Sequence, residues 1–206
     1  SAGHDVGMYV ASCQRQGRSI GLSAISDLLR VILGVDELDS PDVVRDKIMR
    51  TRELGLTAPE IGALGVLLGA TPGSEASDSL GRLIRPAFLR VALKLASDRL
   101  TALCFDNADV MDDESQAILD ALLREGRDAR MVVVLAHRPG FVHAWRDGHR
   151  YVEISLDPLS DDDVARLVAT RLAAEEVPVE LLREVTAKSA GNPLYVEEYL
   201  KALGDA

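Results

Sequence analysis

Two short apolar runs, joined by a helical pattern, organise the middle of the chain. The first run (residues 100–105) ends on Asp106, and the second (residues 131–136) ends shortly before Arg138. Between them, apolar residues recur at helical spacing over residues 116–124. This alternation predicts a β-α-β unit whose parallel strands are buried on both faces. Because ligands bind beyond the carboxyl ends of parallel strands, we expect Asp106 and Arg138 to be neighbours at a ligand-binding edge.

Helical patterns fill most of the chain on either side of this unit. Ser40 before a proline, and Thr57 spaced from Glu60 as a capping box, are typical helix starts, and Gly34 is a typical helix end. The other predicted elements are strands at residues 7–13 and 151–156 and helices at residues 22–33, 41–53, 61–68, 80–96, 160–174, 178–190 and 194–203. The pattern therefore predicts an α/β core at residues 1–158, containing a helical insert at 36–98, and a helical subdomain at 159–206.

The composition describes an acidic chain with enough apolar residues for a packed core. Hydrophobic residues make up 47% of the sequence, and the formal net charge is −10. We find no run of Lys or Arg, which argues against nucleic acid as the main ligand, because phosphate neutralisation needs a basic face. One bound nucleotide needs only a few local groups, so that class of ligand stays open.

The two cysteines indicate a reducing compartment. Cys13 and Cys104 both fall in strand-like apolar runs, where buried, reduced thiols are expected. We find no secretory signal pattern and no apolar run as long as a membrane span. The sequence therefore predicts a cytoplasmic protein with no membrane partner.

Asp106 and Arg138 carry the candidate chemistry. An Asp directly after an apolar strand is where phosphate-binding α/β proteins hold Mg²⁺, although an Asp there can also simply start a turn. A guanidinium at the end of the next strand can reach a terminal phosphate, although Arg138 also fits a surface residue before a turn. Asn107 follows Asp106, and its amide cannot take a proton as a general base does.

Further acidic residues follow Asp106, and one familiar phosphate-binding motif is missing. Asp106, Asp109 and Asp112 together suggest a metal-dependent hydrolase, but a solvated turn that caps the next helix explains Asp109, Asp112, Asp113 and Glu114 better. No Gly-Lys pair occurs in the sequence, so the chain has no G-x-x-x-x-G-K-[ST] phosphate loop.

Four motifs occur in the order that is typical of a known family. Residues 103–115 (LCFDNADVMDDES) resemble the Walker B strand and turn of the AAA-like ATPase modules in STAND-type bacterial signalling regulators. Residues 132–140 (VVVLAHRPG) resemble their sensor 1 strand, with Arg138 in the sensor position. Residues 156–163 (LDPLSDDD) resemble the entry to their lid helices, and residues 191–198 (GNPLYVEE) resemble their nucleotide-contacting G-N-P motif.

The resemblance implies a P-loop NTPase-like parallel sheet with a C-terminal helical lid, which binds ATP and Mg²⁺. It places Asp106 on Mg²⁺, Arg138 on the terminal phosphate and Asn107 where the family has a second Walker B acid. The nucleotide-contacting motif falls on Gly191, Asn192 and Pro193. Modules of this kind accompany adenylate or guanylate cyclase, serine/threonine kinase or LuxR-type domains, often with tetratricopeptide repeats, and serve signal transduction and transcription regulation.

The chain departs from the family pattern in two places. The Walker A strand, loop and helix are expected just before Gly7 and are not in this sequence, and Asn107 replaces an acid. We therefore expect a fragment of a STAND-like regulator that by itself binds ATP poorly and hydrolyses it negligibly. The alternative is a nucleotide-independent scaffold for protein interactions. A sheet without its first strand exposes an edge, through which we expect two copies to dimerise.

Overall fold

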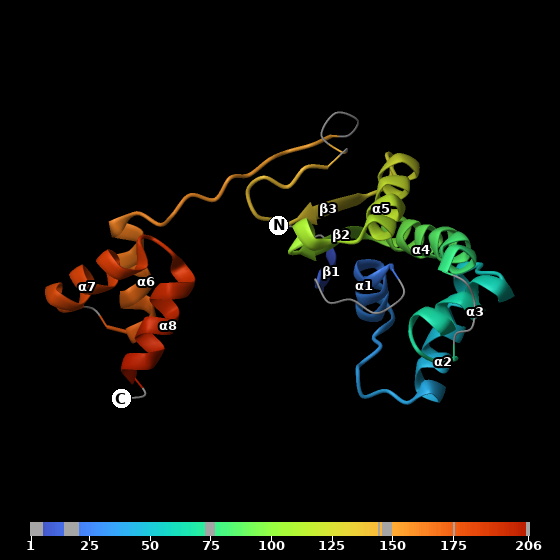
Figure 1. Ribbon diagram of the computed structural model, residues 1–206, viewed down its shortest axis with the longest axis horizontal. Coiled ribbons are helices and arrows are strands. Elements are labelled where there is room, and N and C mark those ends of the chain that lie inside the picture. The colour runs from blue at the N-terminus through green and yellow to red at the C-terminus, as the bar shows by residue number, and fades with distance from the viewer. Residues whose placement is uncertain are drawn as a thin grey trace. The chain divides into compact units, whose positions relative to one another are not determined.

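The computed structural model describes two compact units, one comprising residues 1–151 and the other residues 152–206 (Figure 1). The residues described within them are 6–14, 21–72, 77–143, 145, 150–174 and 176–204. The sequence prediction placed the boundary between core and subdomain at residue 158. Each unit has its own hydrophobic core, so each is described by itself.

A parallel sheet forms the centre of the larger unit. Its strands are β1 (Val6–Ser12), β2 (Leu100–Asp106) and β3 (Met131–Leu135), and in the described part of the chain they lie in the order β1-β2-β3. Both neighbouring pairs are parallel, and the register aligns the carboxyl ends of all three strands. The predicted β-α-β unit and the α/β fold class are therefore confirmed.

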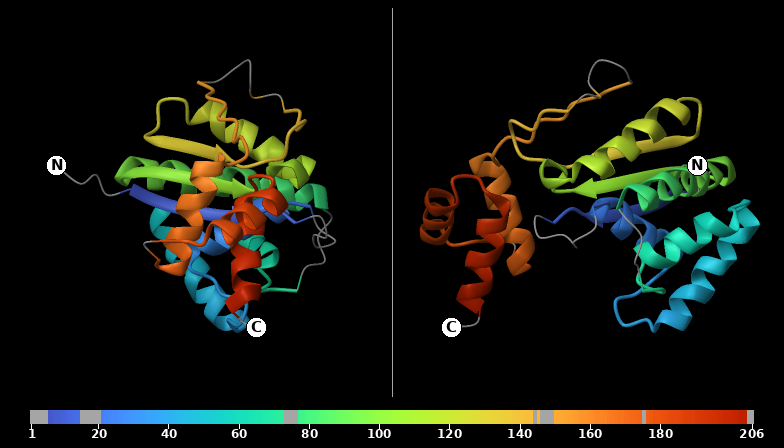
Figure 2. Two further views of the ribbon diagram at one scale, coloured as in Figure 1. Left: turned by 90° about the vertical axis from the view of Figure 1, so that its left-hand side faces the viewer. Right: turned by 45° about the vertical axis from the view of Figure 1, so that its right-hand side comes forward.

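Helices connect the strands and extend the larger unit (Figure 2). Gly34 ends the first of them in the left-handed conformation that the sequence predicts (φ 64°), and Ser40 and Thr57 cap the next two. Residues 36–98 form only helices, turns and connections where they are described. The helices are α1 (Ser23–Leu33), α2 (Pro41–Met49), α3 (Ala58–Leu67), α4 (Ser77–Asp98) and α5 (Asp113–Glu125), with short 3₁₀ turns at Arg50–Leu54 and Ala108–Val110.

Within the larger unit, the described helices cover one face of the sheet. Tyr9, Leu103 and Val133 point to that face and join the core formed with the helices. Right-handed crossovers that advance in one direction, as the order β1-β2-β3 requires, place all connecting helices on the same side.

The opposite side of the sheet, here called the open face, is apolar and largely exposed. Met8 is 65% exposed, and Val10, Val132 and Val134 are each about half exposed. The prediction that the strands are buried on both faces is therefore wrong for the larger unit, because none of its described helices crosses back over this side. The open face comprises Val6, Met8 and Val10 of β1, Leu100, Ala102 and Cys104 of β2, and Val132 and Val134 of β3.

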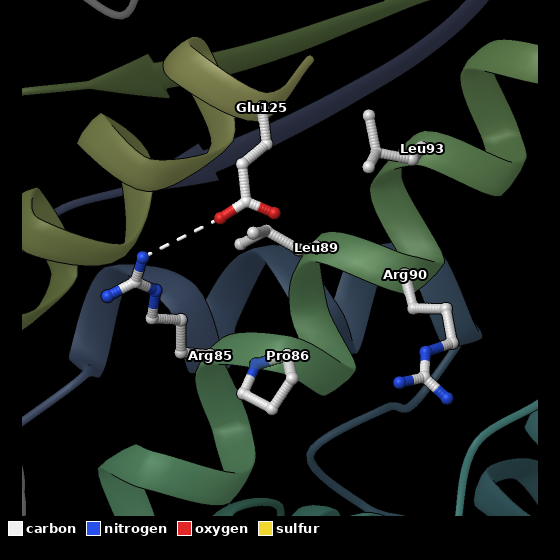
Figure 3. Close-up of a pocket in the computed structure, with 6 residues that line it drawn as sticks. All are labelled: Arg85, Pro86, Leu89, Arg90, Leu93 and Glu125. Carbon is white, nitrogen blue, oxygen red and sulfur yellow. Dashed lines mark ion pairs between the residues drawn. The ribbon is translucent and has the colours of Figure 1, made fainter.

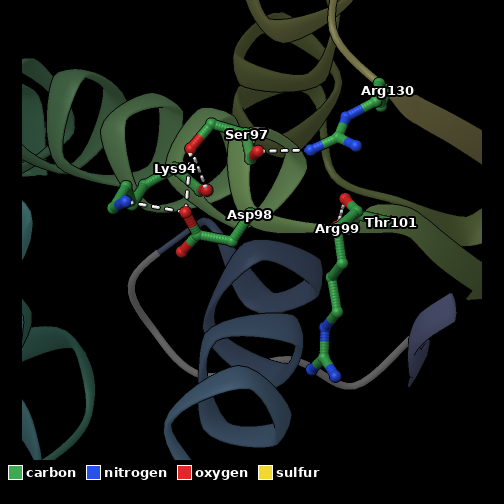
Figure 4. Close-up of polar contacts among 6 residues, drawn as sticks. All are labelled: Lys94, Ser97, Asp98, Arg99, Thr101 and Arg130. Carbon is green, nitrogen blue, oxygen red and sulfur yellow. Dashed lines mark hydrogen bonds and ion pairs between the residues drawn. The ribbon is translucent and has the colours of Figure 1, made fainter. Parts of the chain in front are cut away.

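Polar contacts tie the amino ends of β2 and β3 together. The Arg130 guanidinium donates a hydrogen bond to the carbonyl of Ser97 (Figure 4), and the backbone N–H of Thr101 donates to the carbonyl of Arg130 at 2.9 Å. Within the last turn of α4, Lys94 pairs with Asp98 at 2.7 Å (Figure 4). These contacts fix the turn between α4 and β2 against the start of β3. They align the two strands from their first residues, and hence also at their carboxyl ends.

Asp112 joins the starts of α1 and α5. Its carboxylate accepts hydrogen bonds from the backbone N–H groups of Leu22, Ser23 and Ser115 at 2.8–3.0 Å, and from the hydroxyls of both serines at 2.8–2.9 Å. Burial raises the pKa of this carboxyl, whereas the hydrogen bonds from Ser115, Leu22 and Ser23 lower it. Together the hydrogen bonds have the larger effect, so the pKa of Asp112 lies below its ordinary value. Leu22 is itself buried with φ 74°, and Asp112 holds it there.

The smaller unit is a bundle of α6 (Asp161–Leu172), α7 (Val179–Ser189) and α8 (Pro193–Gly204). Valines and leucines from all three helices form its core, with Val164, Val168 and Val185 fully buried.

The strand predicted at residues 151–156 is wrong. This segment is extended but pairs with no strand of the described chain, and Ile154 is 79% exposed. No helix that the structure describes is long and apolar enough to cross a membrane.

The Asp112 junction predicts a large loss of stability for Asp112→Ala. The substitution removes the cap of α5 and leaves the N–H groups of Leu22 and Ser23 without their acceptor, so we expect a loss of about 2 to 4 kcal/mol in the free energy of unfolding. Asp113→Ala, an exposed position in the same turn, should cost less than about 1 kcal/mol. Urea unfolding of both variants tests the account, and equal losses would contradict it.

The same junction predicts a pH dependence. Because hydrogen bonds lower the pKa of Asp112 in the folded state, its contribution is fully present above the pKa of an unfolded Asp, about 3.9, and is lost as the pH falls through the folded value. The stability difference between the wild type and Asp112→Ala should therefore be constant from pH 7 to pH 5 and shrink below about pH 4. A difference that persists unchanged at pH 2.5 would show that Asp112 acts only through packing.

Candidate functional site

Asp106 and Arg138 both lie at the carboxyl edge of the sheet, Asp106 as the last residue of β2 and Arg138 three residues after the end of β3. Phe105 of β2 pairs with Leu135 of β3, and the N–H of Ala136 donates to the carbonyl of Phe105 at 2.9 Å. Beyond the strands, the backbone N–H of Arg138 donates to a carboxylate oxygen of Asp109 at 3.4 Å. The predicted placement of Asp106 and Arg138 at one edge of adjacent parallel strands is confirmed, while their roles remain predictions.

A shallow depression of about 210 Å³ lies at this edge. Arg138 and Asn107 line it together with Asp109, Val110 and Cys13. Asp106 is not among its lining residues. Side chains along β2 point alternately to the two faces of the sheet, so Asp106 lies on the side of the open face, opposite to Leu103 and Phe105. Cys13 was not predicted at this edge. It directly follows β1, and its place at the end of a predicted strand was the available signal.

Asp106 and Asn107 form a tight turn after β2. Asn107 has φ 54°, and its backbone N–H donates to Asp106 Oδ1 at 2.9 Å. Asn adopts this left-handed conformation more readily than most residues, so the backbone alone gives a reason for an Asn here. Asp106 is exposed, and an ionised carboxylate has about four acceptor positions. It therefore keeps acceptor capacity for an outside ligand.

The electrostatic environment of the edge is negative. Burial, the largest cause, and the nearby carboxylates of Asp112, Asp27, Asp106 and Asp109 raise the pKa of the Cys13 thiol to about 11. Cys13 therefore stays a neutral thiol at physiological pH and does not act as a nucleophile or a thiolate ligand. The same field attracts a cation and opposes an unneutralised triphosphate.

The acidic turn does not form a metal cluster. Asp112 caps α1 and α5, and its oxygens accept five hydrogen bonds. Its cap on α5 agrees with the prediction of a turn that caps the next helix. Among the described residues, no group of three or more His, Cys, Asp and Glu side chains is placed to hold a metal ion. The metal-dependent hydrolase hypothesis thus loses Asp112, one of its three carboxylates.

Gly191, Asn192 and Pro193 form a helix junction within the smaller unit. Gly191 has φ 77°, and its carbonyl accepts a hydrogen bond from the N–H of Leu159 at 2.8 Å. Asn192 Oδ1 accepts the N–H of Leu194 at 3.0 Å, which makes Asn192 the cap of α8, and Pro193 occupies the first helical position. Folding of the bundle therefore explains these three residues without a nucleotide.

A second depression, of about 270 Å³, lies between α4 and α5 (Figure 3). Arg85 and Glu125 form an ion pair of 3.6 Å across it, and Pro86 interrupts the hydrogen bonding of α4 beside it. None of the residues that the sequence analysis selected for a site lines this depression. Its shape follows from the proline and from the side chains of two packed helices.

Comparisons with known proteins cover only the smaller unit. Residues 160–206 match a family model described as a domain of unknown function (DUF8739), which spans α6 to α8. No curated protein and no solved structure matches the chain in these comparisons.

The junction at Gly191 predicts that Gly191→Ala will destabilise the smaller unit. A methyl group at this position would lie 2.5 Å from the carbonyl oxygen of Leu159, in addition to the strain of φ 77°. We expect a loss of about 2 to 4 kcal/mol, seen as faster amide hydrogen exchange in α6 and α8 with β1 to β3 unchanged.

Gly55→Ala is the matched control for this substitution. Gly55 has the same φ of 77°, but an added methyl group meets no heavy atom within 4 Å in the described structure. This control should cost only about 1 to 2 kcal/mol, the price of the backbone conformation. If the two variants lose the same stability, contact with Leu159 does not constrain Gly191.

Proposed function

We propose that this chain is part of an ATP-dependent regulatory module, of the STAND-type AAA-like kind, within a larger signalling protein. One observation carries the proposal: Asp106 and Arg138 lie at the carboxyl ends of adjacent parallel strands, where ligands of such sheets bind. The order of the four sequence motifs and the separate helical unit after the sheet support the same interpretation.

The residues at the edge fit the groups that the proposal assigns to them. Mg²⁺ is usually held by one or two carboxylates together with substrate phosphates, and Asp106 is an exposed carboxylate with spare acceptor positions. Arg138 is exposed beside the depression, and a guanidinium binds phosphate oxygens in a bidentate manner. In this proposal Asp106 binds Mg²⁺ and Arg138 binds the terminal phosphate.

Asn107 sets the expected chemistry of the module. An amide cannot accept the proton of an attacking water, so hydrolysis should be slow, and the module should act as a switch between nucleotide states. Its output would reach cyclase, kinase or LuxR-type domains or tetratricopeptide repeats of the same polypeptide. The chain alone should bind ATP poorly, because the edge is acidic and the sequence has no Gly-Lys phosphate loop.

The second candidate is a nucleotide-independent scaffold for protein interactions, and the open face favours it. Contiguous exposed apolar surfaces on proteins commonly mark interaction sites. β1 and β3 also each have one edge without a partner strand in the described part of the chain, and dimerisation was expected through an exposed edge of the sheet. A scaffold would use the same surfaces whether or not a nucleotide binds.

The ATPase proposal predicts a difference between this chain and the complete protein encoded by its gene. Calorimetry with ATP and Mg²⁺ should show no micromolar binding to the chain and clear binding to the complete protein. In the complete protein, Asp106→Asn should weaken Mg²⁺-dependent ATP binding at least about tenfold. Arg138→Ala should weaken binding of ATP but not of ADP, because ADP lacks the terminal phosphate.

Asp113→Asn, an exposed acid at the same end of the sheet, serves as the control and should leave both affinities unchanged. Micromolar ATP binding by the chain alone would overturn the interpretation of its missing loop. A complete protein that binds no nucleotide would favour the scaffold.

A further inference from the structure

The segment that follows β3 is unusually rich in aromatic rings for this chain. Residues 137–151 contain the single Trp, one of the three Phe and one of the four Tyr of the sequence. The described residues of this segment form no helix or strand, yet Trp145 is only 4% exposed. Because a segment without a backbone ladder is held mainly by its side chains, these rings are the contacts that fix its shape.

The rings form a continuous series of contacts from His137 to Tyr151. Ring centroids are 5.1 Å apart for His137 and Phe141, and 5.3 Å apart for Phe141 and His143. His143 stacks on Trp145 at 5.2 Å with the ring planes 29° apart, and its centroid is 5.4 Å from that of Tyr151. All four distances are typical of favourable ring pairs. These five residues are here called the aromatic clamp.

His143 occupies the centre of the clamp and uses both of its ring nitrogens. The backbone N–H of Trp145 donates to Nδ1 at 3.3 Å, and the hydroxyl of Tyr151 lies 3.4 Å from Nε2. Because a backbone N–H can only donate, Nδ1 is the acceptor, and in the neutral imidazole the proton is then on Nε2, which donates to the Tyr151 hydroxyl. One side chain therefore orients both Trp145 and Tyr151.

The two ends of the clamp lie at functionally different places within the larger unit. His137 directly precedes Arg138, and its Nδ1 lies 2.9 Å from the carbonyl oxygen of Arg138. Tyr151 is the last residue of the larger unit, and the exposed residues 152–158, here called the tether, follow it without helix or strand. The clamp thus connects the segment that carries Arg138 with the point where the tether begins.

We propose that the aromatic clamp is a conformational link, through which the position of Arg138 and the freedom of the tether depend on each other, with His143 as the positioning residue. Closely packed rings transmit a displacement because they have few alternative arrangements. A ligand that repositions Arg138 then changes how firmly Tyr151 is held, and a restraint on the tether changes the affinity for that ligand by the same factor. The link is a property of the larger unit and does not depend on nucleotide binding.

Cleavage of the tether after Glu153 measures the release of Tyr151 in the full chain of 206 residues. A glutamate-specific endopeptidase binds residues on both sides of the bond that it cuts, so Tyr151, two positions before Glu153, has to leave the clamp. His143→Ala should speed this cleavage at least about fivefold, because the open state becomes more populated. Mass spectrometry distinguishes this cut from cuts at other glutamates.

Trp145 reports the same opening without a protease, because its fluorescence is the only Trp signal of the chain. It is buried, so His143→Ala should raise the acrylamide quenching of its fluorescence at least about twofold. Tyr195→Ala is the control, since it removes a ring that stacks on Tyr199 within the smaller unit. This control should leave both the cleavage after Glu153 and the quenching unchanged.

Gly140 tests whether the Arg138 end of the clamp is linked to the tether. It has φ 88° in the turn where the N–H of Phe141 donates to the carbonyl of Arg138 at 3.4 Å, so Gly140→Ala strains this turn. This variant should speed cleavage after Glu153 at least about threefold. Gly55→Ala is the matched control, because Gly55 also has a positive φ and, like Gly140, an added methyl group there meets no heavy atom within 4 Å in the described structure.

The results separate the link from general loss of stability. The proposal predicts faster cleavage for His143→Ala and Gly140→Ala and none for Gly55→Ala. Equal acceleration in both glycine variants, or no acceleration in folded His143→Ala, would overturn it. Acceleration by His143→Ala without any by Gly140→Ala would also overturn it, because the tether would then be held independently of Arg138.

A second pair of variants decides the question if thermal unfolding shows that His143→Ala does not fold. Tyr151→Phe removes only the hydroxyl that lies beside His143 Nε2 and should speed cleavage after Glu153 about twofold. Tyr199→Phe, which removes the hydroxyl that donates to Glu184 in the smaller unit, should leave this cleavage unchanged. An unchanged rate in Tyr151→Phe together with an unchanged rate in Gly140→Ala would contradict the proposal.

Discussion

The structure depends on the order of its parallel strands, which follow one another across the sheet in the same order as in the sequence. Each crossover carries the chain from one parallel strand to the next on the same side, and right-handed connections then put every connecting helix on one face. Two consequences follow from this single constraint. The carboxyl ends of β2 and β3 lie at one edge of the sheet, with Asp106 at the end of β2 and Arg138 shortly after β3, and the described helices of the larger unit leave the opposite face uncovered. The candidate site and the uncovered face of the sheet are therefore two results of one topology.

Local signals in the sequence predicted the helix starts and the strand ends well. Ser40, Thr57 and Ser160 cap their helices as expected, because a cap depends only on residues within one turn. Asp106 and Arg138 were also placed correctly, since two parallel strands joined by one helix have little topological freedom. Aliphatic strands, however, look the same whether one face or both are covered, so the open face was not predictable from periodicity.

The remaining errors concern contacts between distant segments. Asp112 appears in the sequence as one acid among several, and its role depends on Leu22 and Ser23, which lie about 90 positions away. Residues 151–156 have the alternation of a strand, but a strand also needs a partner, and the described chain supplies none. In both cases the deciding information lies in a second segment whose position the local pattern does not contain.

The G-N-P junction shows how one set of residues can support two interpretations. Its backbone and capping contacts explain it fully within the bundle, while the family resemblance assigns it to a nucleotide. The central claim instead concerns the carboxyl edge, and paramagnetic broadening by Mn²⁺-ATP in the complete protein tests it most directly. The account predicts that backbone amide signals of residues 106–110 and 136–140 broaden together. Broadening that spares both segments, or reaches only one of them, would contradict a shared nucleotide edge.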